Sequence, residues 1–283
     1  MEKNIQMGKA IILSVSKIRT FRRKVYNFYK DHGRSFPWRE TSAPYHIAVS
    51  EFMLQQTQVD RVIPKYERFL EVFPDLESLA TATTQDVLRE WQGLGYNRRA
   101  LALRNMALTI AGEHGGVIPD DPETLETLPG IGPYTARAIA VFAFNIPVIL
   151  IETNIRSVYI HVFFNNDTTI HDRQILPLIE QTLDRRNPGK WYSALMDYGA
   201  MLKKNHVNPS RKSAHYTKQS RFEGSDRQLR GAVIRELTAK TSINVNEIPI
   251  LLKAKPERID KILKSLEQEG FISRTNGIIA LKK

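Results

Sequence analysis

The sequence contains no cysteine and no long hydrophobic run. Without cysteine the chain cannot form disulfides, use a thiol as a nucleophile, or hold zinc or an iron-sulfur cluster through thiolates. Its seven histidines lack the spacing of metal ligands, so we predict no metal site and no cofactor. No apolar stretch approaches the ~20 residues that span a bilayer, and residues 10–15 are too short for a signal peptide. We expect a cytoplasmic protein without a membrane partner.

The composition is that of a folded, basic protein. The chain has 283 residues, of which 42% are hydrophobic and 25% charged, enough to bury a core in two or three domains. The chain has 41 Lys and Arg and 30 Asp and Glu, which gives a net charge of +11. This charge favours a polyanionic partner, and nucleic acid is the first candidate. A basic soluble protein without such a partner is the alternative.

Apolar residues recur at spacings of three and four through most of the chain before residue 203, which predicts a mainly α-helical body. Proline and glycine separate the segments, and the connections are short enough for a compact arrangement. No long β-rich region is expected before residue 240. The predicted helices span 45–58, 61–73, 84–92, 98–114, 122–127, 133–144, 154–164, 174–183 and 191–202.

The last eighty residues differ in character. Residues 203–230 are polar, basic and poor in aliphatic side chains, which indicates an ordered strap or a linker. Beyond them we predict helices at 226–239, 246–253 and 256–270, then a hairpin whose turn is Asn276-Gly277. Three helices and a hairpin suggest a winged-helix-like domain. Such a domain suits a DNA groove, a protein contact or a purely structural role, and the pattern leaves all three open.

The segment from Leu128 to Thr135, LPGIGPYT, predicts a helix-hairpin-helix. Gly130 and Gly132 give the backbone freedom for a tight reversal, and Pro133 suits the first turn of a helix. The start of that helix offers unpaired amide donors to a phosphate. An ordinary link between two packed helices would show the same residues.

A second group of polar residues lies in the predicted helix at 45–58. Glu51, Gln55 and Gln58 would share one helical face, because residues three and four apart are neighbours. Amides can hydrogen-bond base edges or fill the gap left by an extruded base, and a Glu in an apolar helix can hold a raised pKa and donate a proton. A solvated polar face is the alternative.

With its other motifs, the chain resembles the adenine DNA glycosylases (MutY) of the helix-hairpin-helix glycosylase superfamily, relatives of endonuclease III. The resemblance covers about residues 36–201 and includes these segments: Phe36-Pro-Trp-Arg39, SEFMLQQTQV at 50–59, Ile63-Pro-Lys-Tyr66, Trp91-Gln-Gly-Leu-Gly-Tyr96, LPGIGPYTARAIA at 128–140, Glu152-Thr-Asn154 and Met196-Asp-Tyr-Gly-Ala-Met201. It implies a mainly α, two-lobed helix-hairpin-helix DNA glycosylase fold with the winged-helix-like domain at the C-terminus. We expect one lobe from residues 1–45 and 142–220, the six-helix lobe at 46–141, and the last domain at 221–283.

The resemblance implies a monofunctional DNA glycosylase of base excision repair. It would act as a nucleoid-associated monomer on double-stranded DNA containing a mismatch or damaged base. It would flip a mispaired adenine, opposite 8-oxoguanine or G, out of the duplex and hydrolyse its N-glycosidic bond. Glu51 matches the family's catalytic Glu, which protonates the departing base. Glu152 stands where the family has a catalytic Asp, whose carboxylate stabilises positive charge on the deoxyribose. A helix-start acid interacting with the helix dipole is a further role for Glu152.

Other site residues also follow from the resemblance. Asn154 matches an Asn that supports the site, although capping a helix would also explain it. Tyr134 occupies the position of the Schiff-base Lys in the bifunctional relatives, so strand cleavage by an amine should be weak or absent. The matching Tyr of some adenine glycosylases contacts the reacting centre; packing of the hairpin is the alternative. The DNA-binding residues are expected to be Gln55, Gln56 and Tyr96, which enter the stack or touch the opposite base, and Gly130, Gly132 and Thr135 of the hairpin.

Two departures from the family pattern shape these expectations. Most members carry four cysteines beyond the MDxGAM helix that bind a [4Fe-4S] cluster, whereas this chain has Lys203 at the first of these positions. We therefore expect no cluster, with the basic strap replacing its structural role and keeping cations near phosphates, unless the strap only packs. The adenine enzymes also usually end in a domain that recognises 8-oxoguanine, and the tail here is shorter.

Two alternative functions remain open at the level of sequence. The same scaffold serves enzymes that remove T or U opposite G, because the hairpin and the acid motif do not read the flipped base. The Glu at position 152 also leaves open a non-catalytic DNA-binding protein on this scaffold.

Overall fold

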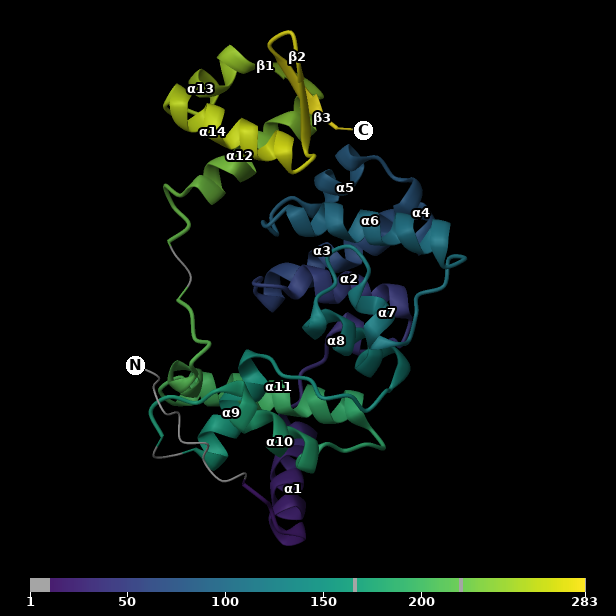
Figure 1. The fold of residues 1–283 in the computed structure, drawn as a ribbon, viewed down its shortest axis with the longest axis vertical. Coiled ribbons are helices and arrows are strands. Elements are labelled where there is room, and N and C mark those ends of the chain that lie inside the picture. The colour runs from purple at the N-terminus through teal and green to yellow at the C-terminus, as the bar shows by residue number, and fades with distance from the viewer. Residues whose placement is uncertain (1–10, 165–166, 219–220, 283) are drawn as a thin grey trace, which may run out of the picture. The chain divides into compact units, whose positions relative to one another are not determined.

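The fold is taken from a computed structural model, which describes residues 11–164, 167–218 and 221–282 (Figure 1). Contacts within the chain divide it into two compact units. The first unit joins Met1–Ser42 to Pro133–Lys218, and the second joins Ala43–Gly132 to Gln219–Lys283. Residues 133–141 of the hairpin region therefore group with the first unit, and the C-terminal segment groups with the second. The domain bounds expected from the sequence remain predictions.

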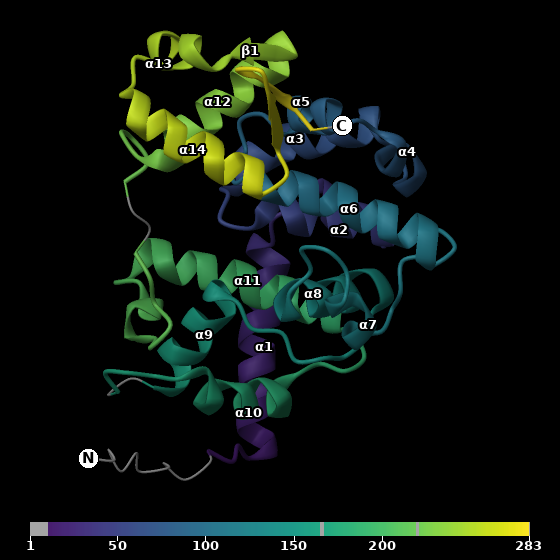
Figure 2. The same ribbon diagram turned by 45° about the horizontal axis from the view of Figure 1, so that its top comes forward.

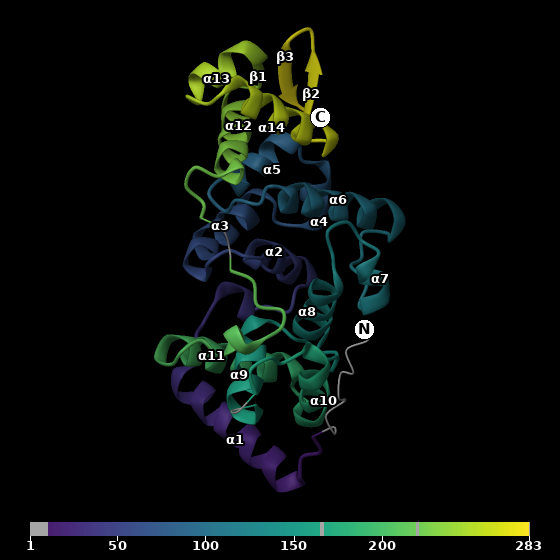
Figure 3. The ribbon, with the colours of Figure 1, turned by 60° about the vertical axis from the view of Figure 1, so that its left-hand side comes forward.

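Helices dominate the first unit. Its core is aromatic and aliphatic, with Trp191, Tyr192, Tyr159 and Val25 fully buried. The longest helices, α1 and α11, pack together, and α9 packs along α11 (Figure 3). The elements are α1 (Val15–His32), η1 (Pro37–Arg39), α8 (Pro133–Phe144), α9 (Thr153–Phe163), α10 (Asp172–Thr182), α11 (Pro188–Asn205) and η2 (Pro209–Lys212).

The residues of the expected strap do not form one extended segment. Lys203 lies in the last turn of α11, and η2 follows. Ser213 then forms an isolated parallel bridge with Ile170, so this stretch is attached to the first unit. The strap's expected end lies in α12 of the second unit. Residues 219 and 220 of the expected strap lie outside the described residues.

Asp197, on α11, links that helix to the segment before α2. Its side chain is 1% exposed and accepts hydrogen bonds from the guanidinium groups of Arg34 and Arg39 at 2.6–3.0 Å. The backbone N–H of Arg34 also donates to it. The two arginines lie against the Phe36 ring. Two sequence motifs, Phe36–Arg39 and Met196–Met201, therefore meet around one buried carboxylate.

Replacing this carboxylate should destabilise the first unit. Burial alone would raise the pKa of Asp197, but hydrogen bonds and charge from Arg39 and Arg34 outweigh it and hold the pKa below its ordinary value. We expect Asp197→Asn to lower the free energy of unfolding by about 3 kcal/mol at neutral pH, because two cations lose their buried partner. Because the pKa of Asp197 is lower in the folded than in the unfolded protein, its ionisation stabilises the fold at pH values above the ordinary pKa of aspartate. This stabilisation is lost as the pH falls through the pKa of the folded state. Urea unfolding should therefore show that the difference in free energy of unfolding between the wild type and Asp197→Asn becomes smaller in acid. Equal stability of Asp197→Asn and the exposed control Asp31→Asn would contradict this account.

The second unit begins with six helices. They are α2 (Pro44–Leu54), α3 (Val59–Val72), α4 (Leu76–Thr81), α5 (Thr84–Trp91), α6 (Arg98–Glu113) and α7 (Pro122–Glu126). Their core includes Phe52, Phe69, Leu79 and Trp91. Helices α1 and α4 are absent from the sequence predictions; α4 is a single short helix whose N-terminus has a capping box between Asp75 and Ser78. Most other predicted helices match to within a few residues at each end.

The C-terminal part of the second unit has a winged-helix arrangement. It includes one strand, β1, that the sequence did not predict. Its elements are α12 (Asp226–Lys240), β1 (Ser242–Asn244), η3 (Val245–Glu247), α13 (Ile248–Leu251), α14 (Pro256–Gln268), β2 (Ile272–Thr275) and β3 (Ile278–Leu281) (Figure 2). The strands form an antiparallel sheet in the order β1-β3-β2. Asn276 and Gly277 both have positive φ, of 48° and 76°, as a tight primed hairpin turn requires.

The C-terminal part is attached to the six helices by specific contacts. α12 packs on α5, and Gln85 donates to the backbone carbonyl of Thr238 at 2.9 Å. Glu269 at the end of α14 binds Arg98 of α6 and Arg230 of α12. Burial would raise the pKa of Glu269, but hydrogen bonds from Arg98, Arg230 and Ser265 lower it to about 2. The carboxylate is therefore charged at any physiological pH, and it joins the two parts of the unit.

Among the described residues, no helix combines the length and the apolar character needed to cross a membrane.

Candidate active site and DNA-binding elements

Glu51 lies in α2, a helix that is buried on nearly every side. Residues 45 and 47–53 are all buried, and Glu51 itself is 6% exposed. The alternative of a solvated polar face therefore does not hold for this residue. A buried carboxyl group needs a reason to be there, because burial of a charge is costly. A role as a proton donor supplies one.

The sequence prediction for the end of this helix was wrong. α2 ends at Leu54, Gln55 is its C-cap, and Gln56 has a positive φ of 55°. Gln55 and Gln58 therefore do not extend the helical face of Glu51. Instead, the chain turns at Gln55 and Gln56 before α3 begins, and the side chain of Gln56 is exposed.

Arg99 of α6 explains why the helix stops there. Its guanidinium donates to the backbone carbonyls of Phe52, Met53 and Gln55 at 2.7–2.9 Å. It also donates to the carbonyl of Gly95 at 3.1 Å. A cation at a helix C-terminus satisfies carbonyls that lack an intrahelical partner. Burial lowers the pKa of Arg99 to about 10, so the group stays charged at neutral pH.

Arg99 thereby connects the Gln55-Gln56 turn to the loop that carries Tyr96. This loop turns through Gly93 and Gly95, and Tyr96 has a positive φ of 47°. Arg99 lies 5.5 Å from the Tyr96 ring centroid. Arg227 of α12 lies 5.3 Å from the same ring and donates to its hydroxyl at 2.5 Å. Three of the predicted DNA-contact residues, Gln55, Gln56 and Tyr96, thus lie on two turns held by one arginine. Neither Arg99 nor Arg227 was identified from the sequence.

The hairpin forms as the glycines and prolines predict. The N–H of Ile131 donates to the carbonyl of Leu128 at 3.2 Å, with Pro129 and Gly130 between them. Gly130 has φ +75°, as the third residue of a type II turn requires. A Cβ at Gly130 would lie 2.5 Å from the Ala102 Cβ and 2.9 Å from the Phe52 ring, whereas one at Gly132 would meet nothing within 4 Å. The first glycine is required by the fold, and the second is not.

These two glycines should separate folding from DNA binding. We expect Gly130→Ala to destabilise the protein by about 2–4 kcal/mol, because it combines a left-handed backbone with steric overlap. Gly132→Ala should leave stability within about 0.5 kcal/mol of the wild type. It should still weaken DNA binding roughly tenfold if the hairpin backbone approaches phosphate. Thermal unfolding and fluorescence anisotropy with a labelled duplex measure the two effects. Unchanged DNA affinity in Gly132→Ala would remove the hairpin from the interface.

Pro133 is the first residue of α8, with Tyr134 and Thr135 directly after it. Tyr134 is half-buried and packs against the core of the first unit; its contact with the reacting centre stays a prediction. Thr135 is 3% exposed. A buried Thr135 side chain is poorly placed to touch DNA directly, and any contact from this residue would come from its backbone at the helix start. Its role as a DNA-binding residue stays a prediction.

Glu152 is the N-cap of α9. One carboxylate oxygen, Oε1, accepts from the backbone N–H groups of Asn154 and Ile155 at 2.7 and 2.8 Å. The other oxygen, Oε2, accepts from the Asn154 side-chain amide at 3.2 Å. Burial raises the pKa of Glu152, while those backbone hydrogen bonds and the charges of Lys203 and Arg156 oppose the rise. The structure therefore shows the role of helix cap, and the catalytic role of Glu152 stays a prediction.

Asn154 is held from its other end by α11. Lys203 donates to its Oδ1 at 2.8 Å. One turn earlier on α11, a Cβ at Gly199 would lie 2.2 Å from the Asn154 carbonyl oxygen. Only a glycine lets the two backbones approach this closely. Gly199, which sequence reasoning did not single out, brings α11 into contact with the residue that supports Glu152.

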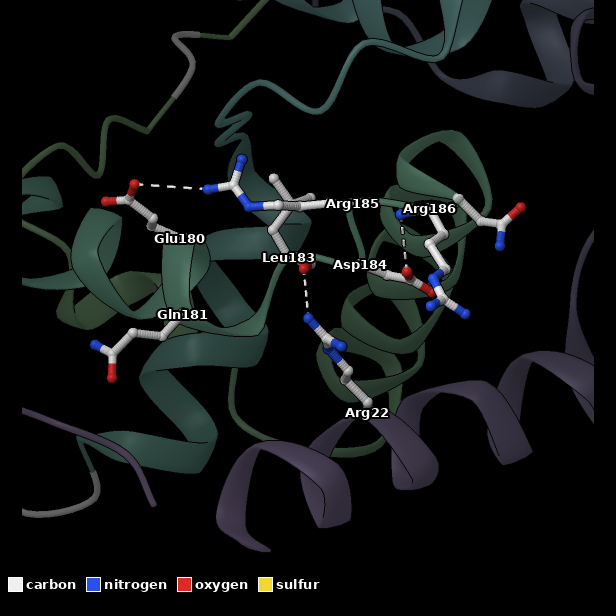
Figure 4. Close-up of a pocket in the computed structure, with 8 residues that line it drawn as sticks. Arg22, Glu180, Gln181, Leu183, Asp184, Arg185 and Arg186 are labelled. Carbon is white, nitrogen blue, oxygen red and sulfur yellow. Dashed lines mark hydrogen bonds and ion pairs between the residues drawn. The ribbon is translucent and has the colours of Figure 1, made fainter. Parts of the chain in front are cut away.

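The predicted catalytic and DNA-binding residues are divided between the two units. Glu51, Gln55, Gln56, Tyr96, Gly130 and Gly132 belong to the second unit; Tyr134, Thr135, Glu152 and Asn154 belong to the first. An open pocket of the first unit, between α1, the end of α10 and the segment before α11, is lined by other residues (Figure 4). Two of its arginines already have partners: Arg22 donates to backbone carbonyls, and Arg185 pairs with Glu180 at 3.7 Å. We assign it no role in catalysis.

Comparison with known proteins identifies the family. The model of the HhH-GPD superfamily base excision DNA repair proteins matches residues 49–181. An adenine DNA glycosylase of Mycolicibacterium smegmatis is 33% identical over 270 residues, covering 89% of this chain and 92% of that protein. The chain belongs to the adenine DNA glycosylase family of the HhH-GPD superfamily. An adenine DNA glycosylase of Mycobacterium tuberculosis is likewise 33% identical, over 88% of each chain.

Solved structures agree on the fold. A thermostable thymine-DNA glycosylase superposes with a TM-score of 0.59 at 24% identity, covering 66% of this chain and 87% of that one. An endonuclease III bound to DNA gives a TM-score of 0.53 at 17% identity. At these identities the likeness is one of fold. The expected helix-hairpin-helix glycosylase fold is therefore confirmed.

The iron-sulfur cluster of most family members does not fit this chain. A [4Fe-4S] cluster is held by cysteine thiolates, and the chain has none. Lys203, at the position expected for the first ligand, directs its ammonium to Asn154. In the described part of the chain, no three His, Cys, Asp or Glu side chains are placed to hold a metal ion. That the enzyme works without any cofactor stays a prediction.

Proposed function

We propose that this protein is a monofunctional adenine DNA glycosylase of base excision repair that acts on adenine opposite 8-oxoguanine or G. Membership of the adenine glycosylase family, at 33% identity over 89% of the chain, carries the assignment of the base. The net charge of +11 supports a DNA partner. The choice of 8-oxoguanine or G as the base opposite adenine is a further part of the proposal.

Two carboxyl groups would perform the chemistry. Glu51 donates a proton to the departing adenine, because a neutral base leaves more easily than an anion. Its burial in α2 supports this role, since the carboxyl group is largely shielded from bulk water. As the N-glycosidic bond breaks, Glu152 stabilises the positive charge on the deoxyribose, and water then attacks that sugar. The three donors on Glu152 support a carboxylate held in one orientation.

Tyr134 supports hydrolysis without strand cleavage. A lyase reaction needs an amine to form a Schiff base with the sugar, and the phenol at this position cannot form one. The strand should therefore remain intact after the base has left, until alkali cleaves it at the abasic site.

Base release under single-turnover conditions tests the proposal. Labelled duplexes carrying A:8-oxoguanine, A:G, T:G and U:G are treated with excess enzyme, each with and without alkali. We expect release from the two adenine duplexes, with strand scission only after alkali. Release of T or U would move the same mechanism to another substrate. Tight binding without release from any duplex would favour a non-catalytic DNA-binding protein.

A further inference from the structure

Lys203 donates a hydrogen bond to Asn154, the residue whose amide in turn donates to the proposed catalytic carboxylate of Glu152. It is half-buried in the last turn of α11, where the neighbouring Lys204 is exposed. Gly199 and Lys203 are four residues apart, so they share one face of α11. That face is the one that touches Asn154, through the close backbone approach at Gly199 and the 2.8 Å hydrogen bond from the Lys203 Nζ.

The chemistry of the three groups fixes their order. A lysine ammonium only donates hydrogen bonds, whereas an Asn amide has one accepting and one donating end. With Lys203 on the Oδ1 of Asn154, the Nδ2 of that amide must face Glu152, to which it donates at 3.2 Å. Reversing the amide would place two donors against each other and oxygen against carboxylate. Lys203 therefore reinforces the orientation in which the Nδ2 of Asn154 reaches the carboxylate.

The charge of Lys203 acts in the same direction. Arg156, the other cation that acts on Glu152, forms a two-bond ion pair with Asp172 at 2.7 Å. Asp172 in turn has His215 at 3.9 Å. Much of the charge of Arg156 is thus balanced by that carboxylate. The positive charge of Lys203 favours an ionised Glu152, while burial lowers the pKa of Lys203 and Glu152 opposes that change.

We propose that Lys203 is a positioning residue for base release, which orients Asn154 so that its amide holds the Glu152 carboxylate toward the sugar. The inference rests on the proposed function. It also gives a specific use to the side chain that occupies the position expected for a cluster cysteine: a cation in place of a thiolate ligand supports the active-site carboxylate directly.

The first test compares Lys203→Met with Lys203→Arg and with the control Lys190→Met, an exposed lysine of the same helix that lies outside the basic strap. We expect Lys203→Met to lower the single-turnover rate at saturating enzyme roughly 10- to 100-fold, as for loss of a charge-assisted hydrogen bond that holds a catalytic group. Affinity for the duplex and the melting temperature should stay near the wild-type values. Lys203→Arg should retain most of the rate. A fall in affinity with an unchanged saturated rate would instead assign Lys203 to phosphate binding and overturn the proposal.

A double mutant separates positioning from a general structural role. If Lys203 acts through Glu152, Lys203→Met should have little further effect in the Glu152→Gln background. An equal loss in both backgrounds would overturn the proposal. The wild type and Glu152→Gln in the same assay distinguish the two levels of inference. No adenine release by the wild type sinks the proposed function; release that is lost in Glu152→Gln but kept in Lys203→Met sinks only the role of Lys203.

The absence of cysteine permits a chemical rescue that does not depend on the Met variant folding. In Lys203→Cys the introduced thiol is the only one in the chain, so alkylation with 2-bromoethylamine restores an ammonium there, with modification verified by mass spectrometry. We expect this reagent to recover the rate and iodoacetamide, which adds a neutral amide, to leave it low. Recovery with both reagents would show that bulk alone suffices and would overturn the proposal.

Discussion

Glu51→Gln should reduce the single-turnover rate of adenine release by at least about 1,000-fold, toward the upper end of what a general acid contributes. The substitution keeps the size and shape of a side chain that is 6% exposed, so it removes the transferable proton with little change in packing. The departing adenine would then leave as an anion, which is the unfavourable step that protonation avoids.

The measurement is base release from the A:8-oxoguanine duplex with enzyme in excess, followed over hours. Glu67→Gln on the exposed face of α3 is the matched control and should retain the wild-type rate. Thermal unfolding and duplex binding should show that Glu51→Gln still folds and binds DNA. A rate within tenfold of the wild type would remove Glu51 from the chemistry, whatever its burial.

The local parts of the fold were within reach of the sequence. The turn at Gly130, the start of α8 at Pro133 and the hairpin at Asn276-Gly277 depend on residue types that prefer those backbone conformations. Helix α1 could also have been found. Ile18, Phe21, Val25 and Phe28 recur at three- and four-residue spacing and face the core. The many basic residues between them conceal this pattern.

The details that shape the site depend on residues far away in the chain. The end of α2 at Leu54 is set by Arg99, more than forty residues further on. The support of Glu152 involves Lys203, whose contact with Asn154 spans 49 positions. Strand β1 has three residues and no length from which to recognise a period. It forms because β3 offers an edge. Such features require tertiary contacts, which a single sequence does not display.

Substitution of Glu152 should also cause a large loss of rate. Its two roles, helix cap and charge stabilisation, can be separated by the choice of substitution. As the N-cap of α9, its carboxylate contributes through the helix dipole and two backbone hydrogen bonds, typically about 1 kcal/mol of stability. As the group that stabilises positive charge on the sugar, it contributes to the rate. Glu152→Gln keeps a carbonyl oxygen for the cap and loses the charge. We therefore expect a loss of about 100- to 1,000-fold in rate with a small change in melting temperature.

Glu152→Asp makes the argument quantitative. Aspartate is a good N-cap and keeps the charge, but it is one methylene shorter, which moves the carboxylate by about 1 Å away from its productive position. In this chain the Asn154 amide, which accepts a hydrogen bond from Lys203, donates to the longer side chain. We expect the aspartate variant to be slower than the wild type by roughly tenfold and faster than Glu152→Gln. Single-turnover rates of the three proteins on one duplex provide the comparison. If Glu152→Gln releases adenine as fast as the wild type, the residue serves only as a helix cap; if Glu152→Asp is faster than the wild type, the site is built for the family's shorter acid and the longer one is a handicap.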